Sequence, residues 1–313
     1  MMRIGFVVFP GFQILDLAAM TVFEMANVVS HQPVYELHLL SEHGGAVTSS
    51  AGVAVHTEAF DEQAYDSVIM MGSIGIHTPS PGLLGFLQQA HIGSRRIASI
   101  CTGAFILAEA GLLDGLRAST HWRHARELQR RYPKIKVEED RIFIREGKVW
   151  TSAGMTACID LSLALVEADI GLDASRTIAQ RMVVYHRRTG GQSQFSALLT
   201  LEPKSDRIQT ALTYARSNLH KPLSVEDLAD VAHLSPRQFS RAFRAETGQS
   251  PAKAIENLRV EAAKSMIETA RHPIDVVARE TGFADPERMR RAFIRTLGHP
   301  PQAIKRMARM QTH

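Results

Sequence analysis

The 313-residue sequence lacks several features that would assign it at once to a class of protein. It has only two cysteines, Cys101 and Cys158, too few for a disulfide framework and without a CxxC or Cys/His metal spacing. No apolar stretch approaches about 18 residues, and Pro10 and Gly11 break the N-terminal run MMRIGFVVFPGF. We therefore expect a cytoplasmic protein in a reducing compartment, with no membrane segment.

A strong overall charge is also lacking, because 36 Lys and Arg against 32 Asp and Glu leave a formal net charge of +4. The distribution is uneven: residues 206–313 carry 18 basic and 12 acidic side chains, which leaves 18 against 20 upstream. A local basic excess fits a polyanionic partner such as nucleic acid. It also fits a solvated helical surface, so charge alone does not decide between the two.

Composition and length predict a globular protein of two domains. Apolar residues make up 45% of the chain and charged residues 22%, which is globular composition. The length exceeds what one core usually serves. Periodicity lapses in RRTGGQSQFSALLTLEPKSD, where paired glycines and Pro203 occur. We predict a first domain over 1–187, a linker over 188–206 and a second domain over 207–313.

The first domain alternates short apolar runs with helical patterns. The runs RIGFVVF, YELHLLS, DSVIMMG and RIASIC are separated by helical segments, the first over 15–29. Further helices are predicted over 102–110 and 156–169, and a short hairpin over 142–144 and 148–151. This order predicts an α/β domain with a flavodoxin-like parallel sheet and helices on both faces.

From residue 207 onward the pattern is helical throughout and contains an internal repeat. The two copies are LSVEDLADVAHLSPRQFSRAFRAETGQSP and PIDVVARETGFADPERMRRAFIRTLGHPP. Six positions recur at a separation of fifty residues: Pro236, Phe239, Ala242, Phe243, Gly248 and Pro251 correspond to Pro286, Met289, Ala292, Phe293, Gly298 and Pro301. Ala229 and Ala278 are forty-nine residues apart, so the second turn has one extra residue.

Each copy predicts a helix-turn-helix unit. A short helix (225–232 and 274–281) precedes a turn, and Ser235 and Asp285 then provide N-caps for a second helix with proline at its first position. The matching apolar positions form one buried stripe on each second helix. Gly282 tolerates positive φ in the second turn, whereas the first turn has His233. We therefore predict an all-α second domain with two such units.

The opposite face of each second helix carries side chains suited to base edges and phosphates. These predicted DNA-binding residues are Arg237, Ser240, Arg241 and Arg244 in the first copy, and Glu287, Arg288, Arg290, Arg291 and Arg295 in the second.

Residues 207–310 resemble the AraC/XylS family DNA-binding domain, with AxxxGFxDPExMRRAFxRxxGxxP at 278–301 similar to its signature. The resemblance implies two recognition helices, joined by a linking helix at about 251–270, in successive major grooves of double-stranded promoter DNA. It implies a transcription regulator, expected to be an activator that works with RNA polymerase. By position, the candidate base readers are Arg237, Ser240, Arg241, Glu287, Arg288 and Arg291.

The stretch ASICTGAF places Cys101 where a strand runs directly into a helix, as in a nucleophile elbow. Such a corner would expose the thiol, and the helix N-terminus would lower its pKa. The alternative for Cys101 is a buried cysteine that packs as a small apolar side chain. We assign that role to Cys158, which lies inside an apolar helix. Gly72, Ser73 and Gly75 follow another strand at its carboxyl end, where α/β sheets bind ligands and backbone N–H groups can hold an anion; turn-making is the alternative.

Residues 1–170 resemble the class I glutamine amidotransferase-like, PfpI-type domain found fused to AraC regulators. The resemblance rests on FPGFQILDLAAMTVFE, CTGAFILAEAGLLDGLRASTHW and TSAGMTACIDLSLALVE. It implies that Asp16 lies near the elbow, where it could bind Cys101 or a ligand amine; the alternative is a helix cap. It also assigns His121 to a THW motif, while Thr102 replaces the histidine that follows the nucleophile in PfpI-like peptidases.

We therefore expect a sensor rather than an enzyme, acting as a homodimer without a cofactor and binding a small effector, amine or amino-acid derived. The expected effector pocket comprises Asp16, Gly72, Ser73, Gly75, Cys101, Thr102 and His121. The alternative is a cysteine-dependent hydrolase or hydratase of the isonitrile hydratase type. His121 and His124 could share a helix face, but no third ligand is visible, so no metal site is expected.

Overall fold

The computed structural model describes residues 1–61, 63–184, 188, 190, 194, 205–269 and 272–310. The chain divides into two compact units, 1–190 and 191–313, which we describe separately. Most of the predicted linker lies outside the described residues, so its bounds stay a prediction.

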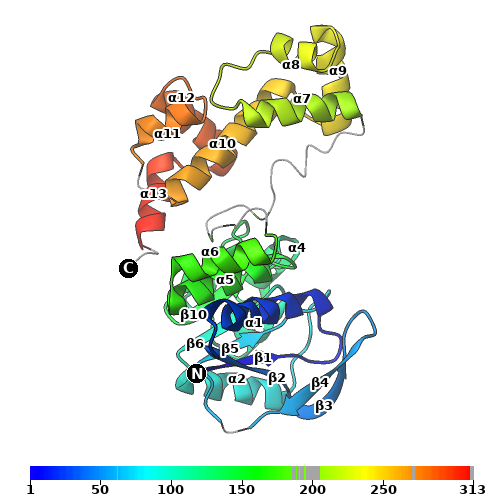
Figure 1. The fold of residues 1–313 in the computed structure, drawn as a ribbon, viewed down its shortest axis with the longest axis vertical. Helices are drawn as coiled ribbons and strands as arrows, with labels where there is room; N and C mark the ends of the chain where they lie inside the picture. Colours follow the sequence, from blue (N-terminus) through cyan, green and yellow to red (C-terminus); the bar gives the residue numbers. More distant parts are fainter. Residues whose placement is uncertain are drawn as a thin grey trace. The chain divides into compact units, whose positions relative to one another are not determined.

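The first unit is built on an eight-stranded sheet with the order β3-β4-β2-β1-β5-β6-β10-β9 (Figure 1). Its strands are β1 Met2–Val7, β2 Tyr35–Ser41, β3 His43–Thr48, β4 Ala54–Ala59, β5 Ser67–Met70, β6 Arg96–Ser99, β9 Phe143–Glu146 and β10 Val149–Ser152. All pairs from β4 to β10 along this order are parallel, and the edge strands β3 and β9 are antiparallel to their neighbours. The five strands from β2 to β10 have the flavodoxin-like order.

Helices cover both faces of this sheet, which confirms the predicted fold class (Figure 1). One face carries α1 Ala18–Ser30, α5 Ala157–Ile170 and α6 Leu172–Arg181; the other carries α2 Pro81–Gly93, α3 Gly103–Glu109 and α4 Trp122–Arg131. β5 and β6 are buried along their whole length, which explains why their sequences are nearly continuous apolar runs. A small second sheet pairs β7 Arg117–Ala118 with β8 Lys136–Val137.

Two features of this unit differ from the prediction. The helix expected over 15–29 is split into a short 3-10 helix, Ile14–Leu17, and α1, because the chain must first turn away from β1. The β3–β4 hairpin was not predicted, because most of its side chains are exposed and give no apolar alternation. The predicted hairpin near residue 147 is confirmed as β9 and β10.

The second unit is helical, as predicted. Its helices are α7 Asp206–Ser217, α8 Val225–Val231, α9 Pro236–Thr247, α10 Pro251–Thr269, α11 Ile274–Glu280, α12 Pro286–Leu297 and α13 Pro301–Met310. They form two cores, one from α7, α8, α9 and the start of α10, and one from the end of α10 with α11, α12 and α13. No helix in the described ranges of the chain is long and apolar enough to span a bilayer.

The predicted start signals of α9 and α12 are confirmed. The Ser235 side chain accepts a hydrogen bond from the N–H of Gln238, and the Asp285 side chain accepts one from the N–H of Arg288. The apolar stripes face the two cores, with Phe243 and Phe293 buried in matching places. Their opposite faces are therefore presented to solvent.

Candidate functional site

Cys101 lies at a sharp corner between β6 and α3, as the elbow pattern predicts. Its φ of 53° is in the left-handed region, which side chains with a Cβ rarely occupy. The corner is held on both sides of the residue: the N–H of Cys101 donates to the carbonyls of Ser152 and Ala153, and the Thr120 hydroxyl donates to the Cys101 carbonyl at 2.8 Å. Neighbouring segments thus stabilise a strained conformation.

The thiol of Cys101 is not exposed, and the expected lowering of its pKa is wrong. The residue is only 5% exposed. Burial raises the pKa of the thiol to about 12, and the nearby Asp16 carboxylate adds to the increase. The cost of placing a thiolate among apolar atoms outweighs the favourable end of a short helix.

Asp16 lies in the 3-10 helix after β1 and is completely buried. Its Oδ2 accepts a hydrogen bond from the N–H of Gly72 at 2.8 Å, while its Oδ1 has no hydrogen-bond partner among the described residues. Burial raises the pKa of Asp16 to about 7, against the opposing effect of the Gly72 hydrogen bond. The alternative cap is wrong, because Gln13 caps the 3-10 helix and Leu17 precedes α1 without a side-chain cap.

The loop after β5 contacts the elbow directly. A Cβ added to Gly72 would lie 2.8 Å from the Cys101 Cβ, so the two backbones touch. The Thr102 hydroxyl accepts from the N–H of Ser73 at 2.8 Å and donates to the Ser73 carbonyl at 2.9 Å. The N–H groups of Gly72 and Ser73 therefore donate to side chains of the protein itself rather than to an anion, which was one of the two roles considered for this loop. Gly75 is exposed, and its carbonyl accepts from the Ser73 hydroxyl.

His121 approaches the thiol at Gly154, a residue that the sequence did not mark as functional. A Cβ at Gly154 would lie 2.3 Å from His121 Cδ2 and 3.0 Å from Cys101 Sγ, so only glycine fits between them. The His121 Nδ1 accepts from the N–H of Arg123 at 3.2 Å. In the neutral ring this hydrogen bond assigns the proton to Nε2. The signal for Gly154 is its position two residues after the end of β10, in TSAGMT.

His121 and His124 do not share a helix face as suggested. His121 is the residue before α4, and the two ring centroids are 6.0 Å apart. Burial, followed by the neighbouring His124 and Arg123, lowers the pKa of His121. The described residues contain no group of three or more His, Cys, Asp or Glu side chains that could hold a metal ion.

Exposed apolar side chains flank the pocket residues in the chain. Leu15, Ile74, Trp122 and Met155 are each at least 40% exposed. They directly adjoin Asp16, Ser73, His121 and Gly154, respectively. An exposed apolar side chain therefore lies next in the chain to each of these four residues.

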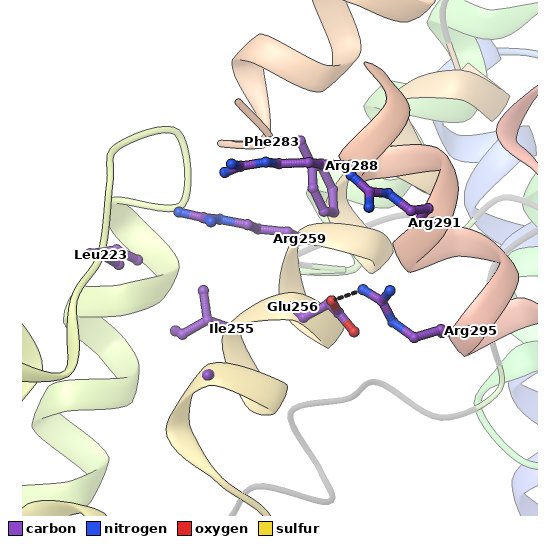
Figure 2. A pocket seen from close by; sticks show the side chains of 9 residues that line it. Leu223, Ile255, Glu256, Arg259, Phe283, Arg288, Arg291 and Arg295 are labelled. Atoms are coloured by element: carbon purple, nitrogen blue, oxygen red, sulfur yellow. Dashed lines mark hydrogen bonds and ion pairs between the residues drawn. The ribbon is translucent and has the colours of Figure 1, made fainter. Parts of the chain in front are cut away.

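The structure divides the predicted DNA-binding residues into three groups. Arg237, Arg241 and Arg244 are exposed on α9, and Ser240 is half-buried beside them. On α12, the residues spaced three and four apart, Arg288, Arg291 and Arg295, line a cavity of about 360 Å³ that faces α10 (Figure 2). Glu287 and Arg290 lie on the other flank of α12 and pair with each other at 3.0 Å.

One of these arginines already has an intramolecular partner from another element. Arg295 donates to Glu256 of α10 at 2.5 Å, as the dashed line in Figure 2 shows. The paired arginine and lysine side chains lower the pKa of Glu256 against the opposing effect of burial. Arg288 also pairs with Asp285, at 3.5 Å. The sequence did not predict these pairs, because α10 and α12 are distant in the chain.

The protein families that match this chain divide it into the same two parts as the structure does. The DJ-1/PfpI family model matches residues 2–168, and a helix-turn-helix domain model matches residues 228–307. The HTH-type transcriptional regulator GbdR of Pseudomonas aeruginosa is 30% identical over 305 residues, covering 96% of this chain and 83% of that protein.

Two further matches concern the first unit. An isonitrile hydratase of Pseudomonas putida is 32% identical over 181 residues, covering 56% of this chain and 76% of that enzyme. The crystal structure of an AraC family transcriptional regulator from Pseudomonas putida matches with a TM-score of 0.53 at 21% identity, covering 58% of this chain and all of that one. The latter likeness supports the fold.

Proposed function

Since the chain belongs to the DJ-1/PfpI family and, over nearly its whole length, to the AraC-type HTH transcriptional regulators, we propose that a small effector bound beside Asp16 and Cys101 controls how its helix-turn-helix units bind promoter DNA. The protein is a DNA-binding transcriptional regulator. The proposal assigns the first unit the role of sensor and the second unit the role of reader.

The observation that carries the sensor role is the half-satisfied Asp16 carboxylate. One oxygen is bound by Gly72, and the other is buried without a partner among the described residues. A buried acceptor left unpaired costs stability, and most buried polar groups in native proteins are hydrogen-bonded. A ligand N–H would satisfy it. This supports an effector with an amine, guanidine or amide group, and Leu15 and Trp122, exposed apolar residues next in the chain to Asp16 and His121, suit an organic remainder.

Sensing is better supported than catalysis by the state of Cys101. A thiol with a pKa of about 12 has almost no thiolate at neutral pH, and the thiolate is the nucleophile. The His121 ring, with its Nδ1 bound to a backbone N–H, presents a donor at Nε2 rather than a base. The strained elbow is the observation that favours the second candidate, a cysteine-dependent hydratase or hydrolase, which the experiment below tests directly.

The proposal extends to assembly and output. A homodimer would place four helix-turn-helix units on paired half-sites, and activation would follow from contact with RNA polymerase. Both expectations rest on the resemblance to AraC regulators. Light scattering of the protein with and without DNA tests the first, and transcription in vitro from a bound promoter tests the second.

The experiment is a thermal-shift screen with amines and amino-acid derivatives, followed by titration of each hit. Wild type is compared with Asp16→Asn, Cys101→Ala and the control Glu24→Gln, which alters an exposed carboxylate of α1. We expect Asp16→Asn to lose the response, while Cys101→Ala and the control keep it. Equal binding by Asp16→Asn would contradict the pocket assignment. Turnover of a nitrile, amide or isonitrile that Cys101→Ala abolishes would favour the enzyme.

A further inference from the structure

Arg259 lies at the point of α10 where the two cores of the DNA-binding unit meet. Residues 254, 255 and 258 of this helix pack in the core of the first helix-turn-helix unit. Residues 260, 263 and 267 pack in the core of the second. Arg259 stands between the two sets, so its contacts bear on how one unit is oriented against the other.

The guanidinium of Arg259 bridges α10 to the loop that follows α7. Its Nε donates to the Leu219 carbonyl at 3.1 Å, and its Nη2 donates to the Lys221 carbonyl at 2.7 Å. Figure 2 shows the side chain extended from α10 toward the segment that carries Leu223, in the first helix-turn-helix half of the DNA-binding domain. A planar guanidinium can bind two carbonyls at once, which a lysine ammonium does with far less geometric definition.

The second helix-turn-helix unit reaches the same Leu219 carbonyl through Gly282. This residue is in the turn between α11 and α12 and has a φ of 76°. A Cβ at this position would lie 1.8 Å from the Leu219 carbonyl oxygen and 2.8 Å from Arg259 Nε. The Leu219 carbonyl, in the loop after α7, is therefore contacted by α10 through Arg259 and approached closely by the turn between α11 and α12.

We propose that Arg259 and Gly282 are positioning residues that hold α9 and α12 at one separation, so that the protein selects DNA by the spacing of its two recognition segments. The inference rests on the DNA-binding function. Inserting one base pair between the segments moves the second by about 3.4 Å and rotates it by roughly 35°. If the two helix-turn-helix units are fixed relative to each other, they cannot both reach their segments after this shift. If only α10 joins them, bending of that helix could restore both contacts.

The test begins with selection of binding sites by the full-length wild type from a randomised duplex pool. Affinity is then measured for the selected site and for versions with one base pair inserted or removed between the two conserved blocks. Wild type, Arg259→Ala, Arg259→Lys and the control Arg279→Ala are compared. Arg279 is an exposed arginine of the same unit that pairs with its neighbour Glu280.

We expect wild type and the control to lose at least about tenfold in affinity on insertion, the scale of one or more mismatched base pairs. Arg259→Ala should lose less than about threefold. Arg259→Lys keeps the charge and should still discriminate poorly, and it replaces the alanine variant if that variant does not fold. If a folded Arg259 variant lost as much affinity on insertion as the wild type, the spacing inference would be overturned and the DNA-binding function would stand. Failure of wild type to select any sequence would instead contradict DNA recognition.

Discussion

The proposed effector pocket and the proposed DNA-reading face place their side chains in opposite surroundings. Asp16 and Cys101 are buried, have shifted pKa values and contact the backbone of neighbouring loops. Arg237 and Arg241 are exposed on a helix whose other face supplies the core. Under the proposed function, the pocket uses the same residues for fold and for ligand binding, whereas the reading helices divide core packing and DNA contact between two faces. Substitutions should therefore affect stability and function together in the first case and separately in the second.

The largest expected effect is on thiol reactivity in the pocket. Because its thiol is buried and its pKa is raised to about 12, Cys101 should react with a disulfide reagent at pH 8 at least about thirtyfold more slowly in the native protein than in urea, since the higher nucleophilicity of a more basic thiolate offsets only part of the lost thiolate fraction. Cys158, whose pKa burial also raises, should react slowly as well, and Cys101→Ala isolates its contribution. Rapid modification of Cys101 in the native protein would contradict the burial of its thiol.

The next effect concerns the pH dependence of stability. Because the folded-state pKa of Asp16, about 7, lies above the ordinary aspartate value of 3.8, the native state binds more protons between these values and stability falls as pH rises toward 7. Asp16→Asn removes this loss and should stabilise the first unit at pH 8 by up to about 4 kcal/mol. Both tryptophans, Trp122 and Trp150, belong to that unit, so fluorescence-monitored urea unfolding measures it. Parallel pH profiles for wild type and variant would contradict the buried carboxylate.

On the reading face, binding and stability should separate. Arg241→Ala and Arg291→Ala should each weaken binding to the selected DNA site by about 1–3 kcal/mol. The stability of the second unit should change by no more than about 0.5 kcal/mol, because both side chains are exposed. Electrophoretic mobility shifts and urea unfolding measure the two quantities, with Arg279→Ala as control. Unchanged affinity in both variants would remove these residues from the interface.

The smallest effect is at the helix starts, where fold and function also separate. Ser235→Ala and Asp285→Ala each remove a side-chain acceptor for an N–H of the following helix. Each should cost about 1 kcal/mol of unfolding free energy while the order of preferred DNA sequences stays the same. Circular dichroism during urea unfolding measures the loss, with Thr213→Ala on the exposed face of α7 as control. A changed sequence preference would mean that the caps also read bases.

The features that the sequence predicted are those encoded by local chemistry. Alternation of apolar runs and helices indicated the parallel sheet, and the fifty-residue repeat indicated both helix-turn-helix units with their caps. The elbow at Cys101 was predictable because a strand ends and a helix begins at one residue. These signals lie within a few residues of the structure that they describe.

The features that were missed depend on segments distant in sequence. The burial of Cys101 follows from Gly154 and His121, which come from loops after β10 and before α4. Pairing of Arg295 with Glu256 requires α10 and α12 to pack together. The proposed role of Arg259 likewise depends on the position of the Leu219 carbonyl, in the loop after α7. Periodicity along a chain carries no information on such contacts.

The most direct test of the whole account is the affinity of the full-length protein for its selected DNA site with and without a saturating ligand from the thermal-shift screen. We predict a ligand-dependent change in affinity for wild type and Cys101→Ala, and no change for Asp16→Asn. The same affinity with and without ligand in wild type, at a ligand concentration that stabilises the first unit, would contradict control of the reader by the pocket.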